Sequence, residues 1–192
     1  MSEQLHRDWM QRAKYGDEHA FTCLVKAYQD KVYSMAFYMT KNKQDAEDMT
    51  QEVFLKLWRT LGTYRGEASP QVWILQIAKH TCYDYLKARK RRETEPLYYE
   101  NDGQEVERPL ADDCEQNDPV KAVEQDERRQ NVTNALMQLP PEHREVLVWR
   151  YVQGLSYEQM ARLAGQSQGT VKSRVFRAKK ILKNILKNSN FF

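Results

Sequence analysis

The segment LSYEQMARLAGQSQGTVKSRVFRAKK, residues 155–180, decides the fold class of this chain. It predicts a short helix from about Ser156, a turn at Gly165 and a second helix capped by Ser167, because Ser favours helix N-caps and Gly favours C-caps. Ser156 and Gln159 also have the spacing of a capping box. Two helices joined by a tight turn are typical of a helix-turn-helix, whose second helix enters the DNA major groove.

The second of these helices has an apolar face and a basic face. At helical periodicity the apolar stripe, which we expect to pack inward, holds Val171, Val175, Ala178, Leu182 and Ile185. The opposite face holds Lys172, Ser173, Phe176, Arg177 and Lys180. No acidic residue follows Glu158, so these cations lack a partner nearby in sequence.

This basic face suits DNA. Lys and Arg neutralise phosphates and donate to guanine, Ser and Thr bond to either, and Phe can contact a thymine methyl group. For the lysines alone there is an alternative, which is that they only stabilise the negative C-terminal end of the helix dipole. These lysines are Lys179, Lys180, Lys183 and Lys187. The whole block with its preceding turn favours DNA binding.

Working outward, the chain divides into three zones. Apolar residues recur at helical spacing from about residue 20 to 92 and again from about 120 to 186, and no confident strand occurs in either zone. Between them, residues 93–119 hold ten acidic residues against Arg108, with three prolines. We expect an all-α fold of two small helical domains, residues 1–92 and 120–192, on a flexible acidic linker. Fully extended, that linker reaches roughly 90 Å, so the domains need not touch.

Composition limits the remaining possibilities. The 192 residues, with 41% hydrophobic residues and a net charge of +3, fit a globular protein with one moderate core or two small cores. We find neither a secretory signal nor a membrane-spanning run, so we expect a cytoplasmic chain without membrane insertion. Cys23, Cys82 and Cys114 are too widely spaced for a zinc site and are expected to be reduced thiols. We expect no metal and no cofactor.

The segment QDAEDMTQEVFLKLWRTL, residues 44–61, predicts a helix with an unusual outer face. Its inward stripe holds Ala46, Met49, Val53 and Leu57, whereas the reverse face holds Asp48, Gln51, Glu52 and Leu55, with Trp58 at its edge. An acidic face that also exposes apolar groups indicates a docking site for a basic protein partner. The alternative is that Trp58 folds back into the core.

The next predicted helix begins near Pro70, after Ser69 as its cap. We expect the inward face to hold Trp73, Ile74, Ile77, Ala78 and Tyr85, and the outer face Gln76, Lys79, Tyr83 and Lys87. The outer face leads into the basic run at residues 87–92. Cations interleaved with an aromatic ring suit single-stranded nucleic acid, although such a run is more often solvated surface.

Four segments in order resemble the extracytoplasmic-function sigma factors of bacteria, group four of the sigma-70 family: DAEDMTQEVFLKLW, YRGEASPQVW, IAKHTCYDYLKARKRR, and LPPEHREVLVWRYVQGLSYEQMARLAGQSQGTVKSRVFRAKKIL. The resemblance covers about residues 20–92 and 132–186. It implies a region 2 domain, a region 4 domain and a dissociable subunit that binds core RNA polymerase, recognises a promoter and helps to open it. It also implies an anti-sigma factor as a partner, for which a long tether leaves room.

The resemblance assigns roles to residues. Docking on the beta-prime clamp helices would use Asp45, Asp48, Gln51, Glu52, Leu55 and Trp58, and the second domain would contact the beta flap. A flipped base of the minus-ten element would be taken by Tyr64, Arg65, Gly66, Glu67, Ala68, Ser69, Lys79, His80, Tyr83, Asp84 and Lys87. The minus-35 element would be read by Thr170, Lys172, Ser173, Arg174, Phe176 and Arg177.

Two positions beside the base-capture residues depart from the family pattern. Pro70 stands where an aromatic residue is frequent, and His80 stands where Asn is common, so the minus-ten preference is the least transferable property. His80 is equally compatible with an ordinary surface histidine. The acidic linker is expected to run near the polymerase active centre and RNA exit path.

Other classes of function remain as alternatives. A stand-alone helix-turn-helix regulator would explain the second domain, and a polymerase-docking adaptor would explain the acidic helix. The sequence shows no catalytic nucleophile, metal cluster or phosphate-binding Gly loop, so an enzyme is the least favoured class.

Overall fold

The computed structural model describes residues 3–94 and 130–188, and every regular element within these residues is a helix. The predicted all-α fold is therefore confirmed. We call residues 3–94 the N-terminal half and residues 130–188 the C-terminal half. The predicted acidic linker, Cys114 and the role expected for the linker fall outside the described residues, apart from residues 93–94, which continue the last helix of the N-terminal half.

The N-terminal half is built from four helices: α1 at Glu3–Lys14, α2 at Glu18–Thr40, α3 at Lys43–Thr60 and α4 at Pro70–Thr94, with a short 3₁₀ turn at Leu61–Thr63. Side-chain caps start two of them, because Asp17 accepts from the Ala20 amide and Asn42 accepts from the Asp45 amide. The predicted start of α4 is confirmed, with the Val72 amide donating to Ser69 Oγ.

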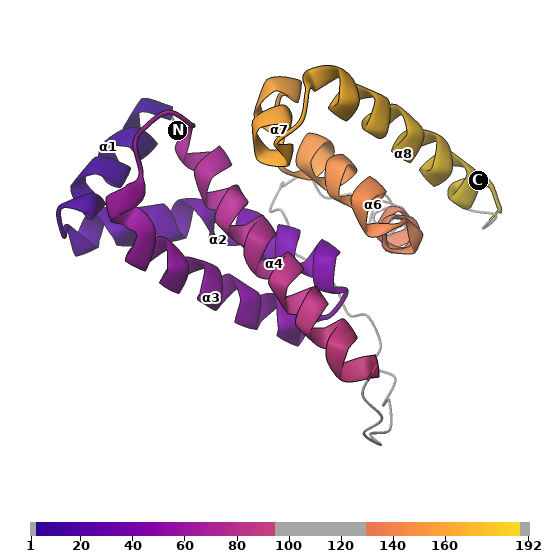
Figure 1. The fold of residues 1–192 in the computed structure, drawn as a ribbon, viewed down its shortest axis with the longest axis horizontal. Coiled ribbons are helices and arrows are strands. Elements are labelled where there is room, and N and C mark those ends of the chain that lie inside the picture. Colours follow the sequence, from indigo (N-terminus) through magenta and orange to yellow (C-terminus); the bar gives the residue numbers. More distant parts are fainter. Residues whose placement is uncertain (1–2, 95–129, 189–192) are drawn as a thin grey trace, which may run out of the picture.

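Helix α2 is the centre of the N-terminal half, and α1, α3 and α4 all pack against it (Figure 1). The expected inward stripe of α3 is confirmed, with Ala46, Val53 and Leu57 buried and Met49 partly buried. On α4 the expectation was too narrow: Ile74 and Ala78 are buried as predicted, but Val72, Leu75 and Cys82 are buried as well. This helix contacts helices of both halves, so a single apolar stripe underestimates its buried surface.

The C-terminal half starts with helical residues 130–138. Helix α6 at Pro141–Leu147 runs directly into a π-helical turn at Val148–Val152, and α7 at Tyr157–Ala164 and α8 at Gln168–Asn188 follow. Its core contains Trp149, Met160, Val171, Val175 and Ala178.

The helix-turn-helix predicted from residues 155–180 is confirmed in its details. Ser156 and Gln159 form the capping box at the start of α7. Gly165 ends that helix with a φ of 63°, a left-handed conformation that favours glycine. Ser167 Oγ accepts from the Thr170 amide at 3.1 Å and caps α8.

The two halves lie in direct contact. Helix α2 packs against α6 and the π-helical turn, and α4 packs against α7. Two glutamines link the backbones of both halves: Gln71 Nε2 donates to the Gln153 carbonyl at 2.9 Å, and Gln153 Nε2 donates to the Lys31 carbonyl at 2.9 Å. The sequence did not predict whether the two halves pack together. Their packing places helix surfaces with predicted roles against one another.

Candidate functional site

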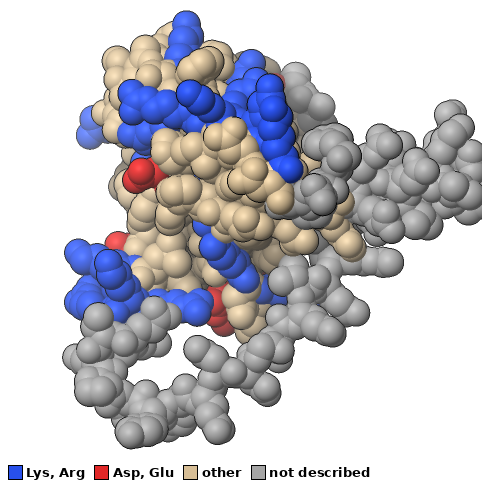
Figure 2. All heavy atoms as spheres, turned by 90° about the vertical axis from the view of Figure 1, so that its right-hand side faces the viewer, with Lys and Arg blue, Asp and Glu red and all other residues tan. Residues whose placement is uncertain are grey.

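The outer face of α8 carries an exposed set of cations around an exposed aromatic ring. Phe176 is 71% exposed, and Lys172, Ser173 and Arg177 are exposed beside it, with Thr170 at the start of the helix. Arg177 Nη2 donates to Ser173 Oγ at 3.2 Å across one helical turn. Figure 2 shows Lys and Arg side chains gathered over the C-terminal half, at the top of the view. Such an exposed apolar ring among cations indicates a binding surface.

Arg174 differs from its neighbours on α8. Its side chain is half-buried, and its charge lowers the pKa of both Tyr83 and Glu145 against the larger effect of burial. Arg174 is therefore near enough to both groups for its charge to act on them, whereas the other members of the predicted minus-35 set are exposed.

The loop at residues 64–69 connects the 3₁₀ turn to α4. Tyr64 is only 2% exposed, donates from its hydroxyl to the Ala68 carbonyl at 2.8 Å and packs against Trp73, with ring centroids 5.1 Å apart. Burial raises the pKa of Tyr64. Tyr64 therefore braces the loop from inside, while Arg65 and Glu67 are exposed on its surface.

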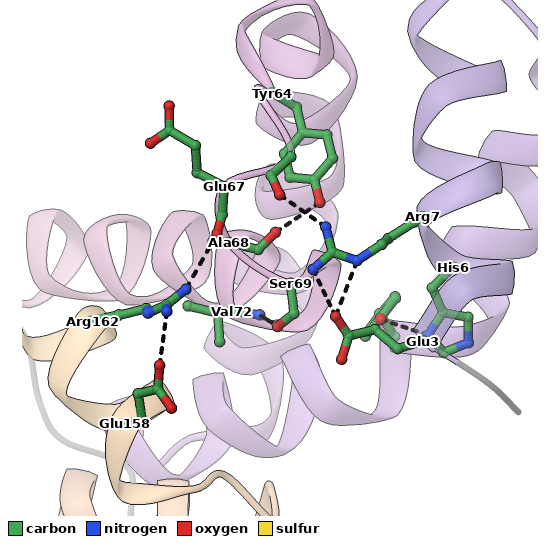
Figure 3. A network of polar contacts seen from close by, with 12 residues as sticks. Glu3, His6, Arg7, Tyr64, Glu67, Ala68, Ser69, Val72, Glu158 and Arg162 are labelled. Carbon is green, nitrogen blue, oxygen red and sulfur yellow. Dashed lines mark hydrogen bonds and ion pairs between the residues drawn. The ribbon is translucent and has the colours of Figure 1, made fainter.

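Three cations donate to backbone carbonyls of this loop, as the close-up in Figure 3 shows in part. Arg7 Nη1 donates to Gly66 at 2.8 Å and Lys14 Nζ donates to Tyr64 at 3.2 Å, both from α1. Arg162 Nη1, from α7, donates to Glu67 at 3.2 Å. Each arginine is held by a carboxylate one turn away, Glu3 for Arg7 and Glu158 for Arg162. None of these three contacts was predicted from the sequence.

The outer face of α4 is divided between solvent and the C-terminal half. His80, Asp84 and Lys87 are exposed. Lys79 Nζ instead donates to the Leu163 carbonyl at 3.1 Å and lies 5.3 Å from the centroid of the Trp149 ring. The Tyr83 hydroxyl donates to Glu145 Oε2 at 2.9 Å, although its side chain remains 37% exposed.

Glu145 is a buried carboxyl at the contact between the halves. Burial raises its pKa, and the charge of Lys79, the hydrogen bond from Tyr83 and the charge of Arg174 offset part of that effect. Burial and the neighbouring Glu145 also raise the pKa of Tyr83. The contact between the halves therefore carries a group whose protonation depends on how tightly they pack.

The acidic outer face of α3 borders a groove between α2 and α3 of about 780 Å³. Leu55 is 52% exposed and Trp58 is 40% exposed, and Trp58 makes an edge contact with Phe21 at 4.8 Å between ring centroids. Asp48 and Gln51 are exposed, and Glu52 is half-buried. Trp58 does not fold back into the core, which was the alternative, because its ring lines the groove.

Asp45 lies apart from that groove. It forms an ion pair with Arg89 at 3.3 Å, which ties the start of α3 to α4. Burial, followed by the hydrogen bond with Asp45, raises the pKa of Tyr85 to about 12. Thirteen residues separate Asp45 from Trp58, or about 20 Å along a helix.

A second apolar groove, of about 680 Å³, lies in the C-terminal half. Its apolar lining comes from Val132, Leu136, Leu147, Tyr151, Val152, Leu182 and Leu186, and its rim from Lys179, Lys183 and Lys187. These lysines were predicted to lie on the last helix, but the groove was not predicted, because helical residues 130–138 meet α8 only in the folded chain.

Within residues 3–94 and 130–188, no group of His, Cys, Asp and Glu side chains has the arrangement of a metal site. In the same part of the chain, no helix is both long enough and apolar enough to span a membrane.

Comparison with known proteins places the chain in a family. The chain matches the family models Sigma-70 region 2 at residues 24–92 and Sigma-70, region 4 at residues 129–182. It is 33% identical over 187 residues to the RNA polymerase sigma-H factor of Pseudomonas aeruginosa, covering 97% of this chain and 96% of the relative. It is 35% identical over 187 residues to the ECF RNA polymerase sigma-E factor of Escherichia coli K12, covering 96% of each.

Solved structures share the fold. CnrH in complex with the cytosolic domain of CnrY is similar with a TM-score of 0.69 at 21% identity, covering 96% of this chain and 98% of that one. The sigma factor RpoE of Bartonella quintana, in complex with the anti-sigma factor NepR, is similar with a TM-score of 0.68 at 23% identity, covering 87% of this chain and 96% of that one.

Proposed function

The chain belongs to the sigma-70 family as an RNA polymerase sigma factor of the extracytoplasmic-function group, and from this membership we propose how its surfaces divide promoter recognition among them. Residues 1–92 form the region 2 domain, residues 120–192 the region 4 domain, and residues 93–119 the connection between them. Region 2 docks on core polymerase and captures the minus-ten element, and region 4 reads the minus-35 element.

One observation carries this proposal: the chain exposes both an acidic, apolar face on α3 and a basic helix-turn-helix face on α8. A stand-alone DNA-binding regulator needs only the second face, and a docking adaptor needs only the first. A sigma factor needs both, because it must hold the polymerase and the promoter at the same time.

Polymerase docking uses the groove between α2 and α3. Leu55 and Trp58 provide apolar area at its edge, with the polar Gln51 beside them, while Asp48 and Glu52 of the same helix add negative charge that steers a basic partner. Asp45 contributes mainly by anchoring α3 to Arg89. For the second polymerase contact, with the beta flap, we propose the apolar groove whose rim carries Lys179, Lys183 and Lys187.

Capture of the minus-ten base uses the exposed part of the loop at residues 64–69 together with His80, Asp84 and Lys87. Tyr64 supports this loop from inside. Lys79 and Tyr83 donate to the C-terminal half in this structure, so they become available to DNA when the halves separate. Unstacking a base costs a few kcal/mol, which stacking on an aromatic ring can offset.

Region 4 reads the minus-35 duplex with the exposed face of α8. Thr170, Lys172 and Ser173 lie near the N-terminal end of this helix, the end that enters the major groove, and Phe176 and Arg177 lie one turn further on. Arg174 joins this set when the contact between the halves opens.

The chain acts in the cytoplasm, where it binds polymerase, and it performs no bond chemistry of its own. An anti-sigma factor holds it inactive, as NepR and CnrY are bound to the sigma factor RpoE and to CnrH in the two similar structures.

Transcription from a promoter library tests the proposal. Core polymerase would be mixed with the full chain and linear templates whose minus-ten and minus-35 positions are randomised, and the transcripts sequenced. We expect a defined start site and enrichment of sequence at both elements only when the chain is present. The same library would also be incubated with the chain alone, and the bound DNA recovered and sequenced. Enrichment at one element in that DNA would favour a stand-alone regulator, and no enrichment in the transcripts would overturn the proposal.

A further inference from the structure

Helix α1 lies outside residues 24–92, the part that matches the region 2 family model, yet two of its cations contact the base-capture loop. Arg7 Nη1 donates to the Gly66 carbonyl at 2.8 Å, and Lys14 Nζ donates to the Tyr64 carbonyl at 3.2 Å. The contacts span 59 and 50 residues of sequence, so they hold an N-terminal helix against a distant loop.

The Arg7 side chain is held in place before it reaches the loop. Glu3 Oε1 accepts from Arg7 Nε at 3.1 Å and from Nη2 at 2.7 Å, which fixes the plane of the guanidinium and leaves Nη1 directed at Gly66 (Figure 3). The helix itself is anchored on α2, because His6 Nδ1 and the Tyr28 hydroxyl are hydrogen-bonded at 2.8 Å and their rings make an edge contact with centroids 5.1 Å apart.

The loop closes on itself through the Tyr64 hydroxyl, and the carbonyls of Tyr64 and Gly66 accept from donors on α1. Its hydrogen bonds within the N-terminal half include the Tyr64 hydroxyl donating to the Ala68 carbonyl and the Val72 amide donating to Ser69. Gly66 has a φ of 80°, a left-handed backbone conformation that favours glycine. The two cations of α1 bind carbonyls near the start of this loop, where its backbone leaves the 3₁₀ turn.

We propose, on the basis of the function proposed above, that α1 is a positioning element for minus-ten recognition. Arg7 and Lys14 hold the loop in the shape that accepts the flipped base and do not themselves contact DNA. Because a preordered loop loses less conformational freedom on binding, it binds the matching base more tightly and discriminates more sharply. The two residues act through backbone carbonyls, so they set how well the loop discriminates while its exposed side chains set which base it prefers.

Arg162 makes a similar contact but plays a different part. It reaches the Glu67 carbonyl from α7 in the C-terminal half, so its hydrogen bond is lost whenever the halves separate. Arg7 and Lys14 belong to the same half as the loop, and their contacts remain when the C-terminal half moves away to the minus-35 element. They are therefore the contacts present during base capture.

The test uses the full chain with core polymerase and the library with both elements randomised. For Arg7→Ala we expect the enrichment of the preferred minus-ten sequence over random sequence to fall about tenfold, the size expected from one charge-assisted hydrogen bond. Enrichment at the minus-35 element should stay at the wild-type level. Arg7→Ala combined with Lys14→Ala should lose more, and Arg7→Lys, which keeps a charged donor, should retain part of the discrimination.

Arg12→Ala is the matched control. Arg12 lies on the same helix and pairs with Asp8 at 3.6 Å and with Asp17 at 2.8 Å, on the exposed side of α1. We expect this variant to keep the wild-type enrichment at both elements, while circular dichroism verifies that all variants are folded.

The outcomes are distinct. Wild-type minus-ten enrichment in the Arg7 and Lys14 double variant would overturn the positioning role. An equal loss at both elements, shared by Arg12→Ala, would overturn it in favour of a purely structural role for α1. If the wild-type chain selected neither element, the proposed function itself would fail.

Discussion

Arg144 is a buried charged side chain that donates hydrogen bonds to four backbone carbonyls of the described residues. It is 1% exposed and donates to the carbonyls of Leu136, Met137, Leu139 and Tyr38, the last of which belongs to α2. These bonds satisfy the end of helical residues 130–138 and join the two halves at one point. A buried cation without a carboxylate is tolerated here because four carbonyl dipoles surround it.

Replacing Arg144 should therefore be costly. Arg144→Ala leaves four carbonyls without this donor and opens space beside the contact between the halves, so we expect the free energy of unfolding to fall by about 3 kcal/mol. Urea unfolding followed by circular dichroism measures the change. Arg177→Ala, an exposed arginine of the same half, should change stability by less than about 0.5 kcal/mol. Equal effects of the two variants would contradict the structural role of Arg144.

Glu145, the neighbouring residue, adds a dependence on pH. Burial raises its pKa in the folded chain, so the folded state holds this proton at pH values where the unfolded state has lost it. The stabilising contribution is therefore complete below the unfolded pKa of about 4.3 and is lost as pH rises through the raised folded pKa.

Glu145→Gln removes this titration and keeps an acceptor for the Tyr83 hydroxyl. We expect the variant to be more stable than the wild-type chain at pH 7 and the difference to close as pH falls toward 4. Urea midpoints measured between pH 4 and 8 would show the trend, with Glu142→Gln, an exposed neighbour on α6, as control. A difference that is constant across this range would mean that Glu145 is not the titrating group.

At the scale of single elements, α8 and α3 each present one face to the core and one to a partner. On α8 the buried side holds Val171, Val175 and Ala178, which leaves Phe176 and Arg177 fully on the outside. On α3 the outer face meets α2 at the groove lined by Leu55 and Trp58. The same amphipathic pattern thus builds a nucleic-acid surface in one half and a protein surface in the other, with the difference made by charge.

Loss of the Arg177 side chain should weaken reading of the minus-35 element. A side chain that donates to a base edge contributes about 1–3 kcal/mol, so Arg177→Ala in the holoenzyme should lower the preference for the best minus-35 sequence ten- to a hundredfold. The minus-ten preference should not change. Arg177→Lys, which keeps the positive charge but loses the planar pair of donors, serves as control, and full recovery of the preference with this variant would point to a general effect of charge.

Loss of the Trp58 side chain should weaken binding to core polymerase. An aromatic side chain at the edge of an interface groove typically contributes about 2 kcal/mol, so Trp58→Ala should raise the dissociation constant roughly thirtyfold. Asp48→Ala should slow association more than it speeds dissociation, because an exposed charge mainly steers encounter. Glu47→Ala removes an exposed acid from the same helix and should have little effect. Unchanged affinity for both Trp58→Ala and Asp48→Ala would remove α3 from the docking site.

At the scale of the whole molecule, the packing of the halves covers part of each proposed DNA surface. Lys79 and Tyr83 of the minus-ten set lie at this contact, and Arg162 reaches across it to the base-capture loop. The half-buried Arg174 of the minus-35 set acts by its charge on Glu145 at the same contact. The free chain is expected to bind promoter DNA poorly for this reason, and polymerase binding would have to separate the halves before both elements can be read.

The sequence by itself determined the helix-turn-helix and several helix ends and faces, but not helix α1 or the caps at Asp17 and Asn42. The capping box at Ser156, the left-handed Gly165, the Ser69 cap before Pro70 and the inward stripes of α3 and α8 were all predicted and are all present. These features depend on residues three or four positions apart, so their physical causes lie within a single turn of the chain. The family and its function followed from the same local segments and their order.

Only the tertiary structure decided which of the predicted site residues face solvent and which hold the fold. Tyr64 turned inward, Lys79 and Tyr83 turned toward the C-terminal half, and Arg7, Lys14, Arg144 and Arg162 found backbone carbonyls of distant segments. The physical reason is that every residue carries the same carbonyl oxygen. An acceptor of this kind leaves no mark in the sequence, and its donor can be identified only when the chain has folded and brought the two together.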